Sequence, residues 1–124
     1  MRTCAGLLLV LSSAVLLLAG VGDGRWLTQV PAKDAARDNA ILHESDAAEV
    51  GARLFTQHCA ECHADNAEGK NGKPSLRSEH VAQATPGQLY WLLTNGSLKN
   101  GMPSWSRLPE QQRWQIVAYL KSLR

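Results

Sequence analysis

The sequence predicts an all-α fold, and three observations support that fold class. Apolar residues recur at helical spacing over residues 51–58 and 116–123. Helix-start signals stand at Asp46, Thr85 and Pro109. No stretch alternates apolar and polar residues in the way that a strand leading into a hairpin turn does.

Length and composition limit the classes of protein to which the chain can belong. Its 124 residues provide one small domain. Hydrophobic residues make up 44% of the chain, which excludes a wholly disordered protein. The formal net charge of +2 excludes a strongly basic nucleic-acid binder, so nucleic acid is not expected among the partners.

Residues 1–22 have the features of an export signal. Arg2 supplies a positive charge, and an apolar run follows over residues 5–21. Small residues that suit a signal peptidase come next, at Ala19, Gly20, Gly22 and Gly24. A run of about 17 residues is the shortest that crosses a membrane, so an uncleaved anchor and a buried N-terminal helix are the alternatives to cleavage. Cleaved or anchored, the domain is expected in the periplasm, and it meets the membrane only if the run is retained.

The segment 23–44 is expected to be a linker or extension, because its sequence is mixed and weakly periodic. One helical turn is expected after Pro31. Docking of Trp26, Ile41 and Leu42 onto the domain is the alternative to a free tether.

The domain proper is expected over residues 45–124 and begins with a helix. Asp46 and Glu49 form a variant of the capping box, with Ser45 as a competing cap. One face of this helix carries residues at the spacing i, i+3, i+4, i+7, namely Gly51, Leu54, Phe55 and His58. The stretch 59–63 is expected at the end of the same helix.

Local signals also place the later elements. Residues 64–76 are rich in Gly, Asn and Lys and are expected to form a loop, and residues 78–84 a short helix. A further helix is expected to start with Thr85 as its N-cap, Pro86 at the first helical position and Gln88 at the third. It is expected to end at residues 95–96. After a second loop, Pro109 opens the last helix.

The sequence Cys59-Ala60-Glu61-Cys62-His63 is a C-x-x-C-H motif, which is typical of c-type haem attachment. Two thiols three positions apart on one helical turn can each bond to one haem vinyl group, and the adjacent histidine can then reach the iron. The third cysteine, Cys4, precedes the apolar run and is expected to be a small apolar residue of the leader.

Three alternatives compete with haem at this motif. A thioredoxin-like redox pair needs a βαβ setting, which the pattern lacks. A zinc site needs four ligands around one ion, and His58, Cys59, Cys62 and His63 are too crowded to provide them, while His43 or His80 would be improvised additions. A chance occurrence of the motif is the third alternative.

The haem iron needs a second axial ligand or an open site, and Met102 is the favoured ligand. It stands between Gly101 and Pro103 in a loop, and the chain's other methionine is the initiator. A thioether ligand raises the reduction potential and suits a six-coordinate carrier. The alternative for this methionine is a core filler, and the runner-up ligands are His43, His58 and His80.

From about Ser45 to Arg124 the chain resembles the class I cytochrome c domain of bacterial exported electron carriers. The resemblance rests on the attachment motif and on four further residues that match the family's two terminal helices, Gly51, Phe55, Ile116 and Tyr119. It implies three to five helices around one covalently bound haem. It also implies that the two terminal helices cross nearly at right angles, with the glycine allowing close approach.

The resemblance further implies roles around the haem. Pro74 matches the proline whose carbonyl accepts the Nδ1–H of the proximal histidine. Arg77 could bind a haem propionate, with a solvated loop arginine as the alternative. Trp105 and Trp91 are expected to line the haem or the core. The family often has glycine directly after the histidine, and this chain departs from that pattern with Ala64.

The expected function is a monohaem electron carrier outside the cytoplasm, working between a periplasmic dehydrogenase and an acceptor such as an oxidase or another cytochrome. Enzyme activity is not expected, because both axial positions are filled, no acid–base pair converges on an open site and the chain is short. A haem enzyme or gas sensor with an open site is the second hypothesis, and a non-haem module with a vestigial motif is the third. The small net charge implies no strong long-range steering of partners.

Overall fold

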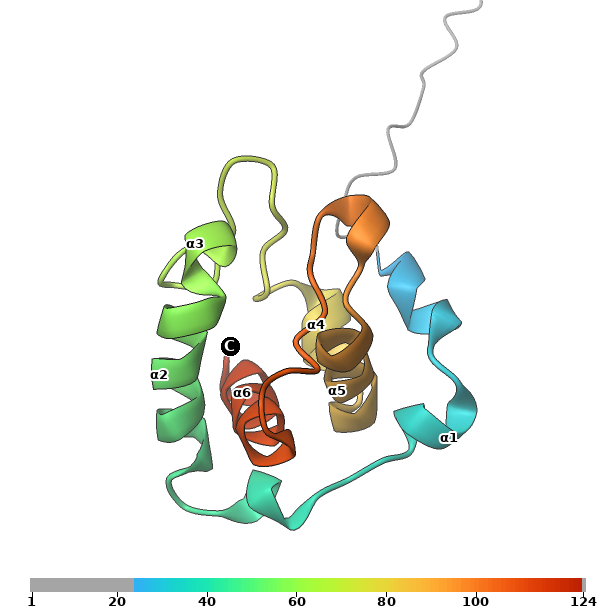
Figure 1. Ribbon diagram of the computed structural model, residues 1–124, viewed down its shortest axis with the longest axis vertical. Coiled ribbons are helices and arrows are strands. Elements are labelled where there is room, and N and C mark those ends of the chain that lie inside the picture. Colours follow the sequence, from blue (N-terminus) through green and yellow to red (C-terminus); the bar gives the residue numbers. More distant parts are fainter. Residues whose placement is uncertain (1–23, 124) are drawn as a thin grey trace, which may run out of the picture.

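The computed structural model describes residues 24–123, and within that range the chain is helical (Figure 1). Its α-helices are α1 (Ala32–Ala35), α2 (Ala47–His58), α3 (Ala60–His63), α4 (Glu79–Gln83), α5 (Pro86–Asn95) and α6 (Glu110–Ser122). Three 3₁₀ turns join them: η1 (Arg25–Gln29), η2 (Ala40–His43) and η3 (Leu98–Asn100). The described residues contain no strand, only an isolated bridge between Ser97 and Met102. The all-α prediction is confirmed, and the helices exceed the expected three to five because α1 and α3 are single turns.

Helices α2 and α6, from opposite ends of the domain, cross and make the most extensive contact between elements (Figure 1). The crossing is tight at Gly51, where an added Cβ would overlap the carbonyl oxygen of Gln115. Beside it, the rings of Phe55 and Tyr119 pack with their centroids 5.1 Å apart. The glycine is therefore required by the close approach of two backbones, as the resemblance implied.

The start of α2 differs from the expected capping box. Asp46 is the N-cap residue, but its side chain caps no backbone N–H. Glu49 instead accepts a hydrogen bond from Arg53 at 2.7 Å, one turn further along the helix. The helix also ends earlier than expected, at His58, and the stretch after Cys59 forms the separate turn α3.

Helix α5 begins and ends where the sequence predicts. Thr85 accepts from the N–H of Gln88, and the Gln88 side chain accepts from the N–H of Thr85, so the reciprocal capping box is complete. Gly96 ends the helix with a φ of 70°. A short helix, α4, precedes α5 within the predicted range 78–84.

The core lies between α2, α5 and α6. Its largest fully buried side chains are Trp114, Phe55, Ile116 and Val117. Trp114 stacks on Tyr90 of α5, with ring centroids 4.1 Å apart and an angle of 15° between the planes. This stacking joins α6 to α5, so that α2, α5 and α6 together form the frame that carries the loops.

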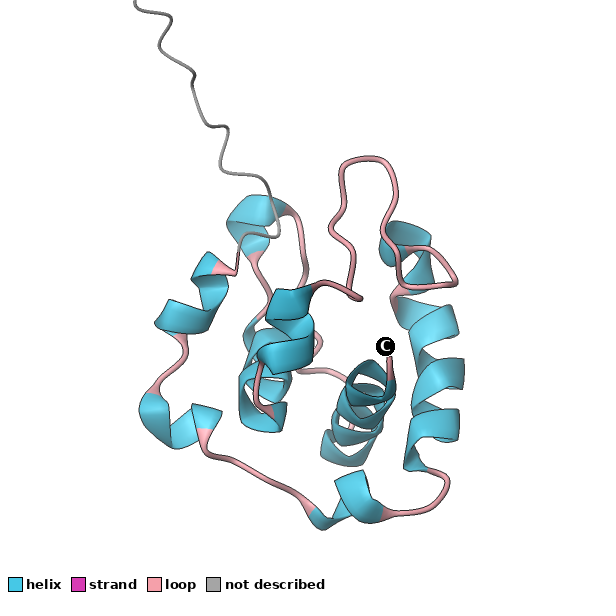
Figure 2. Ribbon diagram, turned by 180° about the vertical axis from the view of Figure 1, so that it is seen from behind, coloured by secondary structure: helices cyan, strands magenta, loops and turns pink. Residues whose placement is uncertain are grey.

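Residues 24–44 run along the outside of this frame, past α5 and α4 (Figure 2). The helical turn expected after Pro31 is α1, and Trp26, Ile41 and Leu42 pack against the core cluster. Within residues 24–123 no helix is long and apolar enough to cross a membrane. The export signal expected over residues 1–22 lies outside the described residues.

Candidate haem site

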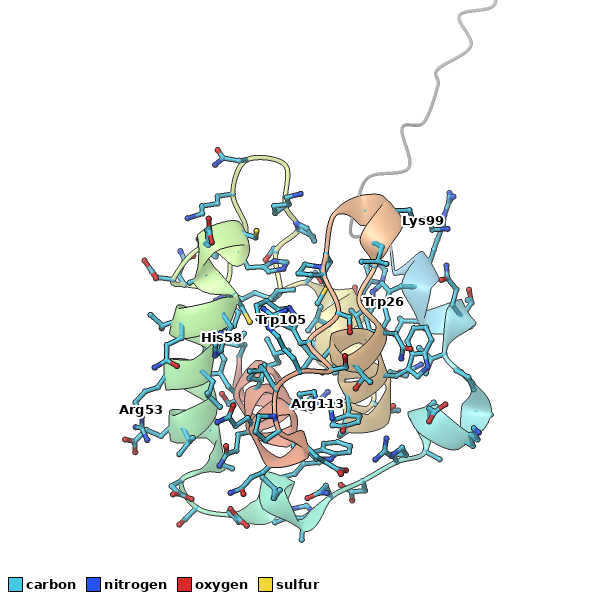
Figure 3. The ribbon with its side chains drawn as sticks, in the orientation of Figure 1. Trp26, Arg53, His58, Lys99, Trp105 and Arg113 are labelled. Carbon is cyan, nitrogen blue, oxygen red and sulfur yellow. The ribbon has the colours of Figure 1, made fainter. Side chains whose placement is uncertain are left out.

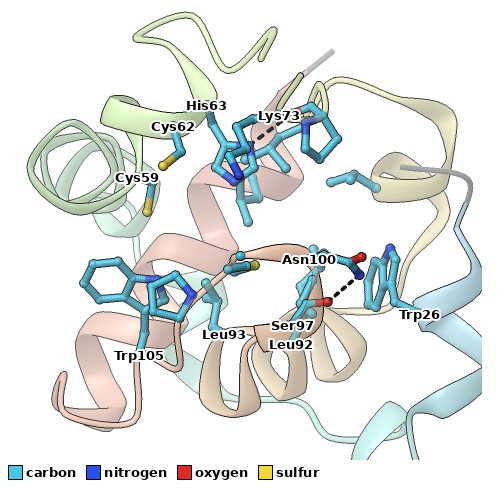
Figure 4. A pocket seen from close by; sticks show the side chains of 18 of the residues that line it. Trp26, Cys59, Cys62, His63, Lys73, Leu92, Leu93, Ser97, Asn100 and Trp105 are labelled. Carbon is cyan, nitrogen blue, oxygen red and sulfur yellow. Dashed lines mark hydrogen bonds between the residues drawn. The ribbon is translucent and has the colours of Figure 1, made fainter. Parts of the chain in front are cut away.

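A cavity of about 610 Å³ opens between α2–α3 on one side and α5 with η3 on the other (Figure 4). Its volume lies within the range of sites that hold cofactors and ligands, about 300–1,000 Å³. Its walls are mostly apolar and include Phe55, Leu76, Val81, Leu89, Leu92, Leu93, Trp105, Ile116 and Leu120. All three functional groups of the C-x-x-C-H motif also line it.

The motif is presented by the break between α2 and α3. The carbonyl of Cys59 accepts from the N–H of Cys62 at 3.1 Å and from that of His63 at 2.9 Å, which starts the new turn. Cys59 is half-buried and Cys62 is exposed, so the two thiols face the cavity from its interior and from its rim. Burial raises the pKa of the Cys59 thiol to about 12, and the nearby Cys62 adds to the shift. Before haem is attached, Cys59 is therefore a neutral thiol at neutral pH.

The His63 imidazole is oriented by a backbone carbonyl. Its Nδ1 lies 3.0 Å from the carbonyl oxygen of Pro74 (Figure 4, dashed line). With its proton on Nδ1, the ring donates this hydrogen bond and keeps the lone pair on Nε2 available to a metal. The contact expected from Pro74 is thus present in the described fold.

The loop over residues 64–76, here called the His63 loop, brings Pro74 to that position. Gly69 donates its N–H to the carbonyl of His63 at 2.8 Å, and an added Cβ at Gly69 would overlap the carbonyl of Lys73. Ala64 holds a φ of 64° and a ψ of 158°, a conformation adopted almost solely by glycine. The position where glycine is often found therefore keeps a glycine-like backbone although it carries a methyl group.

Met102 lines the same cavity from the loop over residues 96–105, here called the Met102 loop. Ser97 and Met102 exchange two backbone hydrogen bonds, at 2.9 and 3.1 Å, which close the loop into a small hairpin. Gly96 permits this path, because an added Cβ there would meet the backbone between Pro103 and Ser104. The methionine side chain is half-buried and packs against the core cluster.

The three histidines considered as alternative ligands lie in different places. His43 is exposed, 3.9 Å from a carboxylate oxygen of Asp38, and does not line the cavity. His58 lines the cavity and packs against Trp105, with ring centroids 5.4 Å apart (Figure 3). His80 also lines it, and its ring lies so near Gly24 that a Cβ added there would overlap the imidazole.

Of the expected haem neighbours, Trp105 lines the cavity, and its ring lies under the guanidinium of Arg107 at 4.4 Å. The expectation for Trp91 is wrong, because that side chain belongs neither to the cavity walls nor to the core cluster. Arg77 is not a lining residue either. Its Nε donates to the carbonyl of Asn66 at 2.6 Å, so the guanidinium braces the His63 loop, and a propionate contact stays a prediction.

The structure adds residues that the sequence patterns did not identify. Trp26 and Lys99 line the cavity, as does Lys73. Arg25, Lys73 and Lys99 make the charged part of the lining basic, against the single carboxylate of Glu61. No local motif marks these positions, since each reaches the cavity through tertiary contacts.

The competing interpretations of the motif find little support in the described fold. Over residues 24–123 no group of three or more His, Cys, Asp or Glu side chains is placed to hold a metal ion, which removes the zinc ligand set. The same residues contain none of the strands that a thioredoxin-like setting needs. Two thiols, an oriented imidazole and a thioether around one apolar cavity do fit a covalently bound haem.

Comparison with known families decides the matter. The model of the family described as cytochrome c oxidase, cbb3-type, subunit III matches residues 46–120. The chain belongs to this family. It is a class I c-type cytochrome, an electron-transfer protein that carries covalently bound haem c.

Individual relatives agree with this membership. Cytochrome c6 of Bryopsis maxima is 36% identical over 76 residues, which cover 58% of this chain and 86% of the relative. Cytochrome cL of the marine methylotroph Methylophaga aminisulfidivorans superposes with a TM-score of 0.59 at 25% identity, over 68% of this chain and 58% of that one. Cytochrome cL of Hyphomicrobium denitrificans has a TM-score of 0.53 at 16% identity, over 77% and 64%, and supports the fold alone. The chain thus spans less than two thirds of these two structures.

Proposed function

We propose that this cytochrome is a monohaem electron carrier in which Cys59 and Cys62 bind the haem covalently and His63 and Met102 are its axial ligands. The observation that carries the proposal is the single cavity that these four side chains line together. It is supported by the hydrogen bond from His63 to Pro74, which leaves Nε2 available for the iron.

Each protein group has a defined task in this proposal. The thiols of Cys59 and Cys62 would add across the two vinyl groups of a haem, each S–H hydrogen passing to a vinyl carbon, so that nothing would be released. Pro74 orients the imidazole, and Trp105 with the leucines of α5 excludes water from the porphyrin faces. A bound haem then supplies one-electron chemistry at its iron. Arg77 is retained as a proposed partner of a haem propionate.

Met102 is preferred over the histidines for the second axial position. His43 lies away from the cavity, while His58 and His80 are already packed against Trp105 and Gly24. A neutral thioether favours ferrous iron and raises the reduction potential. Such a potential suits a carrier that accepts electrons from a periplasmic dehydrogenase and passes them to an oxidase or another cytochrome.

The proposal includes a location outside the cytoplasm. Residues 1–22 carry the charge, apolar run and small residues of an export signal, retained or removed. The domain that follows is proposed to start at residue 45. Mass measurement of the exported protein decides between a cleaved leader and an anchor over residues 5–21.

The central test is made on the protein purified from the periplasmic fraction of a host with c-type haem assembly. We expect one haem per chain that resists acidic organic extraction, a weak long-wavelength band of sulfur-ligated ferric iron, and no binding of carbon monoxide by the ferrous form. Haem that extracts completely, or stoichiometric zinc, contradicts covalent attachment. Ready binding of carbon monoxide by the wild type contradicts the Met102 ligand and favours a sensor or enzyme with an open site.

A further inference from the structure

Residues 24–44 lie outside the stretch that matches the family, which begins at residue 46. They are nevertheless attached to the domain at several separate points and reach the haem cavity. We propose that this segment is a strap whose Trp26 forms the cavity wall facing the two cysteines, where it keeps water from the haem and raises its reduction potential. The inference rests on the haem site proposed above.

Away from the cavity, the strap is held by Arg37. Its guanidinium lies 4.6 Å from the ring centroid of Tyr90 and 5.7 Å from that of Trp114, the stacked pair that joins α5 to α6. It also forms an ion pair with Glu110 at 3.2 Å. Contacts of this kind are worth about 0.5–1 kcal/mol at exposed sites, so together they hold the strap in one place.

The middle of the strap is held by backbone contacts at the start of α5. Thr85, the capping residue of that helix, donates its hydroxyl to the carbonyl of Ala35 at 2.6 Å. Gly87 allows the strap to lie against the helix, because an added Cβ there would overlap the carbonyl oxygen of Asp34. The capping residue of α5 thus serves the strap and the helix at once.

The near end of the strap brings Trp26 to the cavity. Gly24 has a φ of 78°, and an added Cβ there would overlap the imidazole of His80, so the chain enters the domain in close contact with α4. Trp26 then packs against the core cluster and lines the cavity. It lies across the cavity from Cys59 and Cys62 (Figure 4).

A large apolar wall at this point has an electrostatic consequence. Ferric haem carries one more positive charge than ferrous haem, and water stabilises the form with the greater charge. An indole that replaces water lowers the local dielectric and disfavours the ferric state. The reduction potential therefore rises as this wall is completed.

The experiment compares the wild-type holoprotein with Trp26→Ala and Trp26→Leu, and uses Trp91→Ala as the matched control. Trp91 is half-buried on α5 but lines no part of the cavity, so its removal deletes the same side chain without opening the wall. The measurements are covalent haem content, thermal midpoint, reduction potential and the rate at which added imidazole binds the ferric haem.

We expect full haem attachment in all variants. The reduction potential should fall in the order wild type, Trp26→Leu, Trp26→Ala, with imidazole binding several-fold faster in the alanine variant. Trp91→Ala should keep the wild-type potential and rate whatever its thermal midpoint. If Trp26→Ala does not accumulate, the leucine variant alone decides the comparison with wild type.

A Trp26 variant that carries haem and keeps both the wild-type potential and the wild-type imidazole rate overturns the strap's role, even if its thermal midpoint falls. An equal fall in potential for Trp91→Ala overturns it as well, because the effect is then not local to the cavity. Absence of covalent haem from the wild type overturns the proposed function first and the strap's role with it.

Discussion

The two loops that bring protein groups to the haem cavity differ in how firmly they are held. The His63 loop is tied back on itself, since Leu76 donates its N–H to the carbonyl of Ala67 at 2.8 Å and Gly69 donates to that of His63. Ala67 has no exposed surface at all. The loop on the histidine side of the cavity is therefore anchored in the core through Ala67, while most of its other residues reach the surface.

The Met102 loop is a surface hairpin by comparison. Its two ends are joined by the bonds between Ser97 and Met102, and a further bond runs from the N–H of Trp105 to the carbonyl of Leu93 at 2.8 Å. Leu98 at its tip is 74% exposed. Loops with few buried contacts open at low free energy, so the methionine side should yield first and the histidine side should unfold only with the domain.

The largest effect is expected from a change at His63, on the more firmly held side of the cavity. His63→Ala removes the proposed ligand that adjoins both thioethers, and changes to residues that merely orient a metal ligand already cost about 10–100-fold in metal affinity. The yield of low-spin holoprotein should fall beyond that range, measured by absorption and by covalent haem content. His43→Ala is the control, because His43 is exposed and lies away from the cavity. Similar losses in both variants would show that His63 is no ligand.

The second-largest effect is expected at the crossing of α2 and α6, which supports the histidine side of the cavity. Gly51→Val places a branched side chain against the carbonyl of Gln115 and should destabilise the fold by about 3 kcal/mol, the upper end of ordinary overpacking. For a domain of this size that lowers the thermal midpoint by roughly 15 °C. Ala52→Val, on the same helix, controls for the effect of a β-branched residue on helix propensity. Equal midpoints for the two variants would show that the α2–α6 crossing tolerates a side chain.

The loosely held side should show a smaller effect on stability and a clear effect on the site. Met102→Ala should leave the haem attached, remove the long-wavelength ferric band, admit carbon monoxide and lower the reduction potential. Leu98→Ala in the same loop should keep the wild-type spectrum, because Leu98 points to solvent. Retention of both the band and the potential in Met102→Ala would make the methionine a core filler and direct the search to His58 and His80.

The smallest expected effect is a gain in stability. Ala64→Gly relieves a backbone conformation that costs a non-glycine residue about 1–3 kcal/mol. The glycine also gives the unfolded chain more conformational entropy, which lowers the stability by about 0.4–1 kcal/mol. The net gain should be about 1 kcal/mol by denaturant titration of the holoprotein. Ala52→Gly, inside α2, should lose a similar amount. A loss in both variants would mean that the methyl group of Ala64 contributes packing that outweighs the strain.

Elements specified by local signals could be predicted from the sequence. The start and end of α5 follow from Thr85, Pro86, Gln88 and Gly96, which act on backbone groups within one turn of themselves. The same reasoning was wrong at Asp46. Its side chain caps no backbone N–H, and the Glu49 carboxylate accepts from Arg53. A capping pattern thus predicts a helix start without ensuring the bonds.

Features that depend on tertiary contact could not be predicted in this way. The motif and Met102 were candidates from their residue types and setting, and the cavity brings them together. Trp91 and Trp26 show the opposite case. Trp91 was expected to line the haem or the core and does neither, while Trp26 was considered only as a docking residue and forms a cavity wall. Residue type alone does not tell which face of a helix or turn a tryptophan occupies.

The contact of Gly51 with Gln115 joins positions separated by more than half of the chain. During synthesis α2 and the C-x-x-C-H motif emerge long before α6, so this crossing cannot form until the last helix is available. Through that interval both thiols remain on an open chain and are accessible to haem. The order in which the chain is delivered therefore leaves time for the cofactor to be attached before the cavity closes around it.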